Sequence, residues 1–292
     1  MALFQRTVPD PVVAGPNVLR FDHRSLIMGV LNVTPDSFSD GGVHLDPGAA
    51  LAAGLRMVED GADILDVGGE STRPGAPPVP LDQELRRVIP VVGALARAGL
   101  LVSVDTRHAR VAQAALDAGA GMINDVSAMT HDPRMVEVAA RTGAAVVLMH
   151  MRGTPQTMQQ GPIHYEDVVE EVARYLEDRV ASLHAAGVKR SQILLDPGMG
   201  FGKTAEHNLA LNISLERLAR GGLAVCWGPS RKSTLGALLG GVPPSERLMG
   251  TVASCVLAVD RGAHLVRVHD VGPVRQALAV VDATRGAFIR PA

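Results

Sequence analysis

The sequence predicts an α/β protein built as a single (β/α)8 TIM barrel with a short N-terminal extension, and two observations support that prediction. Eight short apolar runs alternate with eight longer helical patterns along 292 residues, and such runs are typical of parallel strands buried on both faces. Aromatic residues make up only 3% of a chain that is 47% hydrophobic, so the core must be aliphatic, like other barrel interiors. An open doubly wound sheet is the alternative, but no Gly-x-Gly-x-x-Gly motif follows the first run.

The apolar runs mark the expected strands, because each run ends in polar residues or glycine where a loop would begin. They cover residues 25–31, 63–67, 101–104, 122–123, 144–149, 192–195, 223–227 and 264–268. The expected helices cover residues 46–60, 81–98, 107–118, 132–141, 166–186, 205–220, 245–261 and 272–285. The first begins at Asp46 and Pro47, a cap followed by proline at the first helical position. Several end in glycine, such as Gly61 and Gly143, which is a common C-terminal cap.

The ends of the chain and its composition limit where the protein works. Residues 1–20 are expected to form an N-terminal extension that packs outside or at the bottom of a barrel spanning residues 21–292. No apolar stretch is long enough for a signal peptide or a membrane helix. The formal net charge of −2 does not point to nucleic acid or a membrane as partner. Cys226 and Cys255 lie in apolar runs, which predicts two buried, reduced thiols and a cytoplasmic location.

Polar residues follow every predicted strand. In a barrel these C-terminal strand ends share one rim, where barrel enzymes place their chemistry. One carboxylate at a strand end is ordinarily a helix cap, but eight strands with polar ends predict a ligand site. The connections over residues 31–46, 68–81 and 150–165 are long and follow strand ends, so they are expected to border that site.

Asp105, Asn124 and Asp196 follow or end three of the predicted strands. Their carboxylates and amide suit a flat nitrogen heterocycle, because carboxylates accept hydrogen bonds from amino and ring N–H groups. Asp125 fits equally well as a cap or as a partner of a site residue. His150 fits a pocket wall or a structural role, and Met149-His150-Met151 is better explained as core than as a soft-metal site.

Lys232, Arg267 and His269 place basic groups on the last two strands, where barrels often bind phosphate. Arg267 and His269 are two residues apart, so their side chains share one face of the strand. Taken singly, Arg267 fits a salt bridge and His269 a structural histidine, but together with residues 230–232 they suit a diphosphate. Asn32 offers a neutral oxygen. Mg²⁺ that is bound mainly through substrate phosphates takes only one or two ligands from the protein.

Seven motifs, in order over about residues 25–285, resemble the dihydropteroate synthase family. They are Asn-Val-Thr-Pro-Asp-Ser-Phe-Ser-Asp-Gly-Gly (32–42), Asp-Val-Gly-Gly-Glu-Ser-Thr-Arg-Pro-Gly (66–75), Ser-Val-Asp-Thr (103–106), Ile-Asn-Asp (123–125), Asp-Pro-Gly-Met-Gly-Phe-Gly-Lys (196–203), Ser-Arg-Lys-Ser (230–233) and Arg-Val-His-Asp (267–270). The resemblance implies a transferase of folate biosynthesis. That enzyme condenses 6-hydroxymethyl-7,8-dihydropterin diphosphate with p-aminobenzoate and releases dihydropteroate and diphosphate.

The resemblance also implies residue roles, a Mg²⁺ cofactor at Asn32, a homodimer and a sulfonamide target. The expected catalytic groups are Asp105, Lys232, Arg267 and His269. The pterin diphosphate would be held by Thr72, Asp105, Asn124, Asp196, Lys232, Arg267 and His269. The p-aminobenzoate pocket and its closing loops would include Phe38, Asp40, Arg73, Pro74, Phe201 and Ser230. Residues 224–229 depart from the family's plainer aliphatic run, and Trp227 would point either into the barrel or onto the helices.

Two other functions compete with this one. The methyltetrahydrofolate domain of corrinoid methyltransferases would share the Asp and Asn groups but has no use for Lys232, Arg267 and His269 as a diphosphate clamp. A non-catalytic paralogue should have lost rim residues, and this set is complete. For the transferase we expect a dissociative, SN1-like substitution, in which diphosphate leaves first and Asp105 stabilises the cation that remains.

Overall fold

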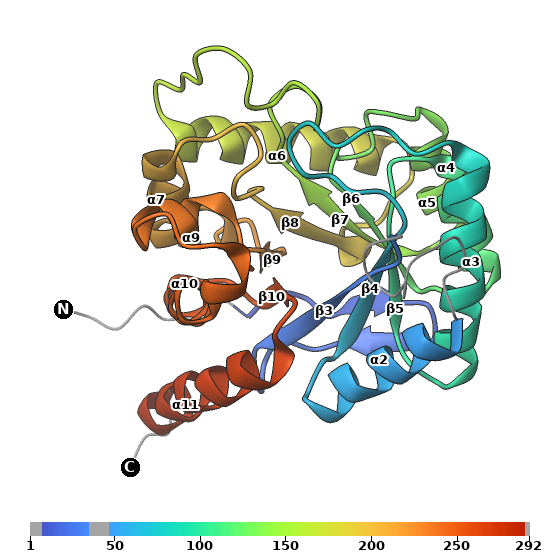
Figure 1. Cartoon of the computed structure of the whole chain (residues 1–292), viewed down its shortest axis with the longest axis horizontal. Helices are drawn as coiled ribbons and strands as arrows, with labels where there is room; N and C mark the ends of the chain where they lie inside the picture. Colours follow the sequence, from blue (N-terminus) through green and yellow to red (C-terminus); the bar gives the residue numbers. More distant parts are fainter. Residues whose placement is uncertain (1–7, 35–46, 290–292) are drawn as a thin grey trace.

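Eight parallel strands close into a barrel in the computed structural model, which describes residues 8–34 and 47–289. Their order is β10-β3-β4-β5-β6-β7-β8-β9, so the last strand closes on the first (Figure 1). This confirms the TIM barrel and excludes the open sheet. The strands are β3 (Leu26–Asn32), β4 (Ile64–Gly68), β5 (Val102–Asp105), β6 (Met122–Asp125), β7 (Ala145–Met149), β8 (Ile193–Asp196), β9 (Ala224–Trp227) and β10 (Leu265–Val268).

The helices surround the barrel in the predicted order, with two differences. They are α2 (Pro47–Glu59), α3 (Leu81–Arg97), α4 (Ala109–Asp117), α5 (Arg134–Thr142), α6 (Val168–Ala185), α7 (Ala205–Ile213), α8 (Glu216–Ala219), α9 (Ser233–Leu238), α10 (Leu248–Asp260) and α11 (Val271–Ile289). The helix predicted over residues 205–220 is interrupted after Ile213, and the short α9 was not predicted. The predicted cap at Gly143 is confirmed by its φ of +72°, a backbone shape that favours glycine.

An N-terminal hairpin lies against the bottom of the barrel, one of the two positions expected for the extension. Its strands β1 (Val12–Ala14) and β2 (Asn17–Leu19) pair antiparallel. Buried side chains of the hairpin join those lining the lower barrel, such as Met28 and Ile64, in one apolar cluster. Burial of these side chains closes the N-terminal end of the strands to water. The division of the chain at residue 20 stays a prediction.

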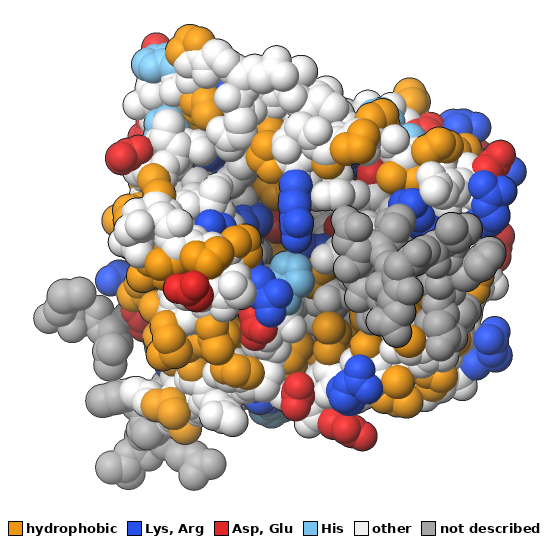
Figure 2. All heavy atoms as spheres, in the orientation of Figure 1, with side chains coloured by type: hydrophobic (Ala, Val, Ile, Leu, Met, Phe, Trp, Pro, Cys, Tyr) orange, Lys and Arg blue, Asp and Glu red, His pale blue; other side chains and the backbone are white. Residues whose placement is uncertain are grey.

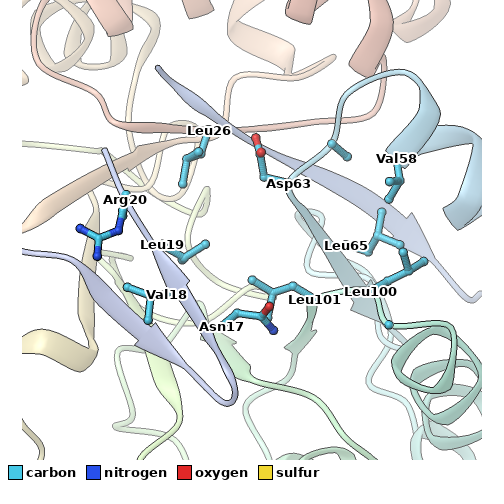
Figure 3. Close-up of a pocket in the computed structure, with 12 residues that line it drawn as sticks. Asn17, Val18, Leu19, Arg20, Leu26, Val58, Asp63, Leu65, Leu100 and Leu101 are labelled. Carbon is cyan, nitrogen blue, oxygen red and sulfur yellow. The ribbon is translucent and has the colours of Figure 1, made fainter. Parts of the chain in front are cut away.

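The two ends of the barrel differ in character. On the face shown in Figure 2, Lys, Arg and His side chains gather around a central hollow. At the opposite end, a cavity of about 330 Å³ lies between the hairpin and the start of β4 (Figure 3). Because the chemistry of such barrels occurs at the C-terminal ends of their strands, this lower cavity is not the candidate active site. Within the described residues, no helix is both long and apolar enough to cross a membrane.

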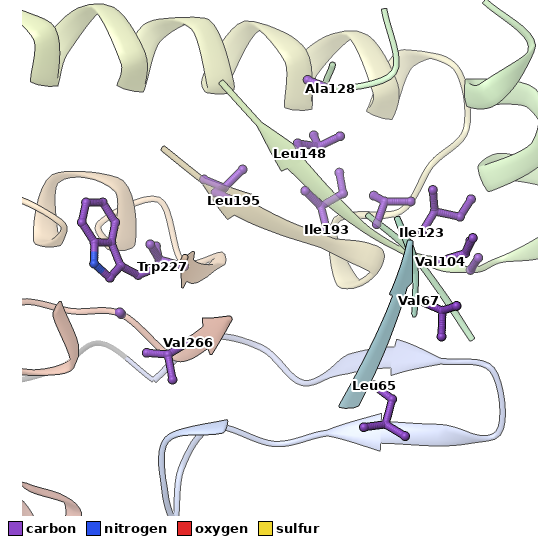
Figure 4. Close-up of a cluster of buried hydrophobic side chains, with 14 of the residues drawn as sticks. Leu65, Val67, Val104, Ile123, Ala128, Leu148, Ile193, Leu195, Trp227 and Val266 are labelled. Atoms are coloured by element: carbon purple, nitrogen blue, oxygen red, sulfur yellow. The ribbon is translucent and has the colours of Figure 1, made fainter. Parts of the chain in front are cut away.

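A second apolar cluster fills the space between the strands and the surrounding helices (Figure 4). Trp227 belongs to this outer cluster, and its Nε1 donates a hydrogen bond of 3.0 Å to Ser254 Oγ on α10. The outward orientation is therefore the correct one of the two expected for Trp227. Cys226 and Cys255 are both free and buried, as predicted. Burial raises the pKa of both thiols, which keeps them protonated.

Candidate active site

The inside of the barrel changes from apolar to polar along each of several strands. Side chains two residues apart share a face, so Ile64 and Asp66 of β4 both point inward, as do Leu265 and Arg267 of β10. The same step from apolar to polar occurs from Met122 to Asn124 on β6 and from Leu194 to Asp196 on β8; the lower member of each pair lies in the closed cluster. The strands therefore deliver the polar groups Asp66, Asp105, Asn124, Asp196 and Arg267 to one layer at the mouth.

Arg267 connects the carboxylates of that layer. Its Nε donates to Asp66 Oδ2 at 2.6 Å and its Nη2 to Asp105 Oδ2 at 2.8 Å. Asn124 Nδ2 also donates to Asp66 Oδ2, at 2.9 Å. The structure thus shows Arg267 in the ion pairs that the sequence left open as an alternative. Its Nη1 makes no hydrogen bond within residues 8–34 and 47–289, and its side chain is 22% exposed, so the Nη1 hydrogens remain available to a ligand.

Asp66 is a site residue that the sequence analysis did not select. Its side chain is fully buried, and its Oδ1 has no hydrogen-bond partner among the described residues. A buried carboxylate oxygen without a partner is costly. The sequence contained two indications that Asp66 belongs to the site. It is the first residue of the motif 66–75, and it is two residues beyond Ile64, which faces inward.

Burial governs the electrostatics of the two predicted carboxylates. It raises the pKa of Asp105, and the Arg267 guanidinium opposes this effect. It also raises the pKa of Asp196, with Lys232 in opposition. Asp196 Oδ1 accepts a hydrogen bond of 2.7 Å from the Gly198 amide. At both carboxylates, neighbouring cations therefore oppose the effect of burial and favour the charged form.

Lys232 and His269 complete the mouth with basic groups. Lys232 Nζ donates to Met199 O at 2.6 Å and lies 4.7 Å from the centre of the Phe201 ring. Burial lowers the pKa of Lys232 to about 8. His269 Nδ1 lies 2.9 Å from Ser230 Oγ. Burial and three neighbouring arginines lower the pKa of His269 to about 4, so without a bound anion His269 is a neutral hydrogen-bonding group at neutral pH.

The anionic and cationic groups converge around Gly228. A Cβ atom placed there would lie 3.7 Å from Arg267 Cβ, 3.9 Å from Asp196 Oδ2 and 3.9 Å from Lys232 Nζ. Glycine therefore leaves open the space between the groups expected to bind the pterin and those expected to bind diphosphate. A site that holds both parts of one substrate requires this proximity.

Residues of the loop after β4 stand further from this cluster. Thr72 is half-buried, whereas Arg73 and Pro74 are exposed. Arg73 nevertheless lies close enough to His269 to help lower its pKa. Phe38 and Asp40 lie outside the described residues. The structure thus brings together the groups of the barrel wall, and it places Arg73 at their edge.

Asp125 supports the site without belonging to it. Its carboxylate accepts hydrogen bonds from Ser127 N at 2.7 Å, Ser127 Oγ at 2.6 Å and Met129 N at 3.1 Å. These bonds hold a loop in which Ala128 and Met129 have positive φ angles of 51° and 60°. Non-glycine residues adopt such angles only where neighbouring bonds require it. Of the two expectations for Asp125, the helix cap is wrong, because the next helix, α5, begins only at Arg134 and the carboxylate holds a turn instead.

A buried polar cluster anchors the loop after β4 beside the mouth. Glu70 accepts from Val79 N at 3.2 Å and from Arg107 Nη2 at 2.9 Å, which joins both ends of the loop to the end of β5. Glu84 accepts from Thr106 Oγ1 at 2.6 Å. Ligand atoms of Glu70, Glu84 and His108 lie within 4.8 Å of one another. Arg107 pairs with Glu70 and Thr106 bonds Glu84, whereas Glu84 Oε2 has no hydrogen-bond partner among the described residues.

The Glu84→Gln substitution is expected to stabilise the protein at alkaline pH. Burial raises the pKa of Glu84 from 4.5 to about 7. As pH rises from 4.5 to 7, the unfolded chain loses this proton before the folded protein does, so stability is lost across that range. Glutamine stays neutral and can still accept from Thr106. Urea denaturation should show that the free energy of unfolding rises by about 2 kcal/mol at pH 8 and changes little at pH 5. The exposed Glu59→Gln is the control and should change neither value. An equal gain at both pH values would contradict this explanation.

Comparison with known proteins identifies the family. The family described as pterin binding enzyme matches residues 28–269. A dihydropteroate synthase of Escherichia coli (strain K12) is 48% identical over 262 residues, which cover 89% of this chain and 92% of the relative. Dihydropteroate synthase of Xanthomonas albilineans, solved with 4-aminobenzoic acid, is 46% identical with a TM-score of 0.88 and covers 98% of this chain and 100% of its own.

A dihydropteroate synthase of Burkholderia cenocepacia, solved in complex with 7,8-dihydropteroate, is also similar. It is 44% identical with a TM-score of 0.88, and the match covers 96% of this chain and 98% of that one. The resemblance that seven separate motifs indicated is therefore confirmed over nearly the whole length. The chain belongs to the pterin binding enzyme family.

Proposed function

We propose that this protein condenses 6-hydroxymethyl-7,8-dihydropterin diphosphate with p-aminobenzoate to give 7,8-dihydropteroate and diphosphate, a transferase step of folate biosynthesis. The observation that carries this proposal is the meeting of two unlike groups around Gly228. Asp105, Asn124 and Asp196 offer acceptors and a donor for a pterin ring, and Lys232 and Arg267 offer charge for a diphosphate. Relatives named dihydropteroate synthase, including one solved with 4-aminobenzoic acid, support the same reaction.

The arrangement supports a dissociative substitution. Lys232 and Arg267 would neutralise the departing diphosphate, and the neutral His269 would donate a hydrogen bond to it. The Asp105 carboxylate would lie near the positive charge left on the pterin methylene and stabilise it electrostatically. The amine of p-aminobenzoate is already neutral, so it can attack without a strong general base. Phe201 and the methylene groups of Lys232 would border the pocket for its ring.

Release of diphosphate tests the overall reaction. The purified protein should release diphosphate when p-aminobenzoate is added to the pterin diphosphate and Mg²⁺, and dihydropteroate should form in equal amount. Tight binding of the pterin diphosphate without turnover would favour the non-catalytic paralogue. The order of bond breaking is tested separately with ¹⁸O in the bridging position of the substrate. Positional exchange without p-aminobenzoate is expected, and its absence together with no diphosphate release would rule out a free cation.

Mg²⁺ is proposed as the cofactor, held at Asn32 together with the substrate phosphates. Asn32 is the last residue of β3, and its half-buried amide makes no hydrogen bond with another described residue. An amide oxygen at the mouth fits a hard cation that takes one or two protein ligands. When bound, Mg²⁺ would offset the negative charge of the leaving diphosphate.

The Asn32→Ala variant is expected to need more Mg²⁺ than the wild-type protein. Loss of one oxygen ligand should raise the Mg²⁺ concentration for half-maximal turnover about tenfold, and removal of divalent cations should abolish turnover in both proteins. A titration of activity with Mg²⁺ measures this. Asn17→Ala on the hairpin at the opposite end of the barrel is the matched control and should leave the titration unchanged. An unchanged titration for Asn32→Ala would remove this residue from the metal site.

A homodimer is proposed through one side of the barrel. Exposed apolar side chains gather on α7, α9, α10 and α11, helices that pack against one another on the same side of the molecule (Figures 1 and 2). They are Leu209, Ile213, Leu238, Leu239, Met249, Leu257 and Val280. A contiguous apolar surface of this kind marks a protein interface.

A single charge on that surface is expected to separate the subunits. Met249 is 73% exposed, so Met249→Glu should leave the fold intact. Each subunit would then place a buried, unpaired charge in the interface. Light scattering after gel filtration should give the mass of one chain for this variant and of two for the wild type. Leu55 on α2 is also an exposed apolar residue, so Leu55→Glu is the matched control and should remain dimeric. A dimeric Met249→Glu protein would place the interface elsewhere.

Two finer properties complete the proposal. We place the protein in the cytoplasm, and its two free, buried thiols support a reducing compartment. We also expect sulfonamides to compete with p-aminobenzoate, as the family resemblance implies. Inhibition that p-aminobenzoate does not relieve would contradict a shared pocket.

A further inference from the structure

Two of the chain's three lysines lie at the mouth of the barrel, and only one of them has a role in the proposed reaction. Lys189 is exposed. Lys232 borders the centre of the site, whereas Lys203 is 3% exposed at the end of the loop between β8 and α7. A buried ammonium group is costly unless hydrogen bonds replace its water. The bonds that Lys203 makes therefore indicate what it does.

Four acceptors surround the Lys203 ammonium group. Its Nζ lies 3.0 Å from Gly198 O, 3.2 Å from Phe201 O, 3.2 Å from His150 O and 2.9 Å from His150 Nδ1. Because an ammonium group only donates, His150 Nδ1 accepts and the imidazole is neutral. Burial and Lys203 lower the pKa of His150 to about 3, which agrees with that assignment. Lys203 thus joins the end of β7 to two points of the loop after β8.

The loop has little room for another arrangement. Gly198 has a φ of +70°, and a Cβ there would lie 2.0 Å from His150 O; Gly202 has a φ of +67° and a Cβ there would lie 2.5 Å from Arg152 Cβ. Only glycine fits both conditions at these positions. The loop therefore packs directly on the residues after β7, and Lys203 holds that contact from inside.

The same loop carries the groups that position Lys232. Met199 O, between the two carbonyls bound by Lys203, accepts from Lys232 Nζ at 2.6 Å. The Phe201 ring lies 4.7 Å from the same Nζ, and the Phe201 carbonyl is one of the four acceptors of Lys203. A movement of this segment would therefore displace both neighbours of the Lys232 ammonium group.

We infer that Lys203 is a positioning residue: its ammonium group fixes residues 198–201 so that Met199 O and the Phe201 ring hold Lys232 in place for the substrates. Lys203 itself does not touch them. This inference rests on the proposed function for its kinetic consequence, but its structural part concerns the protein without substrates. Burial lowers the pKa of Lys203 to about 7, and Asp196 opposes the shift. The four acceptors around Nζ favour the protonated form.

The Lys203→Met variant tests the positioning role, with Lys189→Met as its matched control. Methionine keeps most of the side-chain volume and removes the charge and every hydrogen bond. Hydrogen exchange on the full chain without substrates should become about tenfold faster for amides of residues 198–202 and stay unchanged in distant helices. In the diphosphate-release assay, KM for p-aminobenzoate should rise about tenfold or more, with a smaller fall in kcat. Lys189→Met should change neither measurement.

A second variant separates positioning from bulk stability. Lys203→Ala leaves space for a small amine, so propylammonium should restore p-aminobenzoate binding and slow the exchange of residues 198–202. Neutral 1-propanol, of similar shape, should not. The inference would be overturned if Lys203→Met left both hydrogen exchange and kinetics unchanged. It would also be overturned if Lys203→Met and Lys203→Ala both unfolded and propylammonium did not restore the fold. A wild-type protein without turnover would refute the proposed function alone, because hydrogen exchange still tests the contact between Lys203 and the loop.

Discussion

Replacing Arg267 with methionine is expected to lower kcat/KM about a thousandfold, a loss of about 4 kcal/mol of transition-state stabilisation. The guanidinium pairs with Asp66 and Asp105 through bonds of 2.6 and 2.8 Å, and its Nη1 makes no hydrogen bond with another described residue. Methionine keeps an unbranched, flexible side chain but removes all of these contacts. Steady-state kinetics by diphosphate release, with circular dichroism as a check on folding, measure the effect.

Loss of the fold must be separated from loss of the reaction. Arg267→Met leaves two buried carboxylates facing each other, which destabilises a protein by about 3–5 kcal/mol. The double variant Arg267→Met with Asp66→Asn removes one of these charges, so it should recover most of the stability and little of the activity. Arg24→Met breaks an exposed pair with Asp63 at the other end of the barrel and should cost less than about 1 kcal/mol with normal turnover. Full activity in folded Arg267→Met would exclude it from the anion site.

The Asp105→Asn variant is expected to lower kcat about a hundredfold to a thousandfold with a smaller rise in KM for the pterin diphosphate. The amide keeps the shape of the side chain and an oxygen for Arg267, but it cannot offset positive charge on the pterin methylene. Stopped-flow measurement of diphosphate release separates this loss from slower product release. The exposed Asp117→Asn on α4 is the matched control and should have wild-type kinetics.

The pH profile gives a second measure of Asp105. Burial raises the pKa of its carboxyl, so the group gains a proton as pH falls through a range above that of an ordinary aspartate. The kcat of the wild-type protein should therefore fall as pH is lowered through that range. The kcat of Asp105→Asn should be low throughout and should not change with pH in that range. An unaltered acid limb in the variant would assign it to another group, and unaltered kcat would rule out Asp105 as the stabilising charge.

Strand alternation explains how much of the site could be predicted. The eight apolar runs and their polar ends were sufficient for the barrel and for Asp105, Asn124, Asp196 and Arg267, because a strand residue's face follows from its position. The family resemblance was needed to name the ligands. Lys232 and His269 lie just beyond their strands, and they were predicted as basic groups at the ends of the last two strands.

Pairing between distant residues was not predictable from the sequence. Asp66 and Arg267 are far apart in the chain and meet only because β10 closes the barrel beside β3 and near β4. The neutral state of His269 depends on burial among arginines from three separate segments. The contacts of Lys203 with His150 likewise require the turn at Gly198, which the sequence presents only as one of several glycines.

The single tryptophan also makes the protein its own optical reporter. Trp227 ends β9 with its ring bonded to Ser254 on the outside of the barrel wall, while the next residue, Gly228, lies among Arg267, Asp196 and Lys232. The indole is shielded from water and from the substrates, yet it is one peptide bond from the centre of the site. Its emission wavelength and intensity should therefore follow any shift of that strand end when substrates bind, without a fluorescent label and without altering a residue of the mouth.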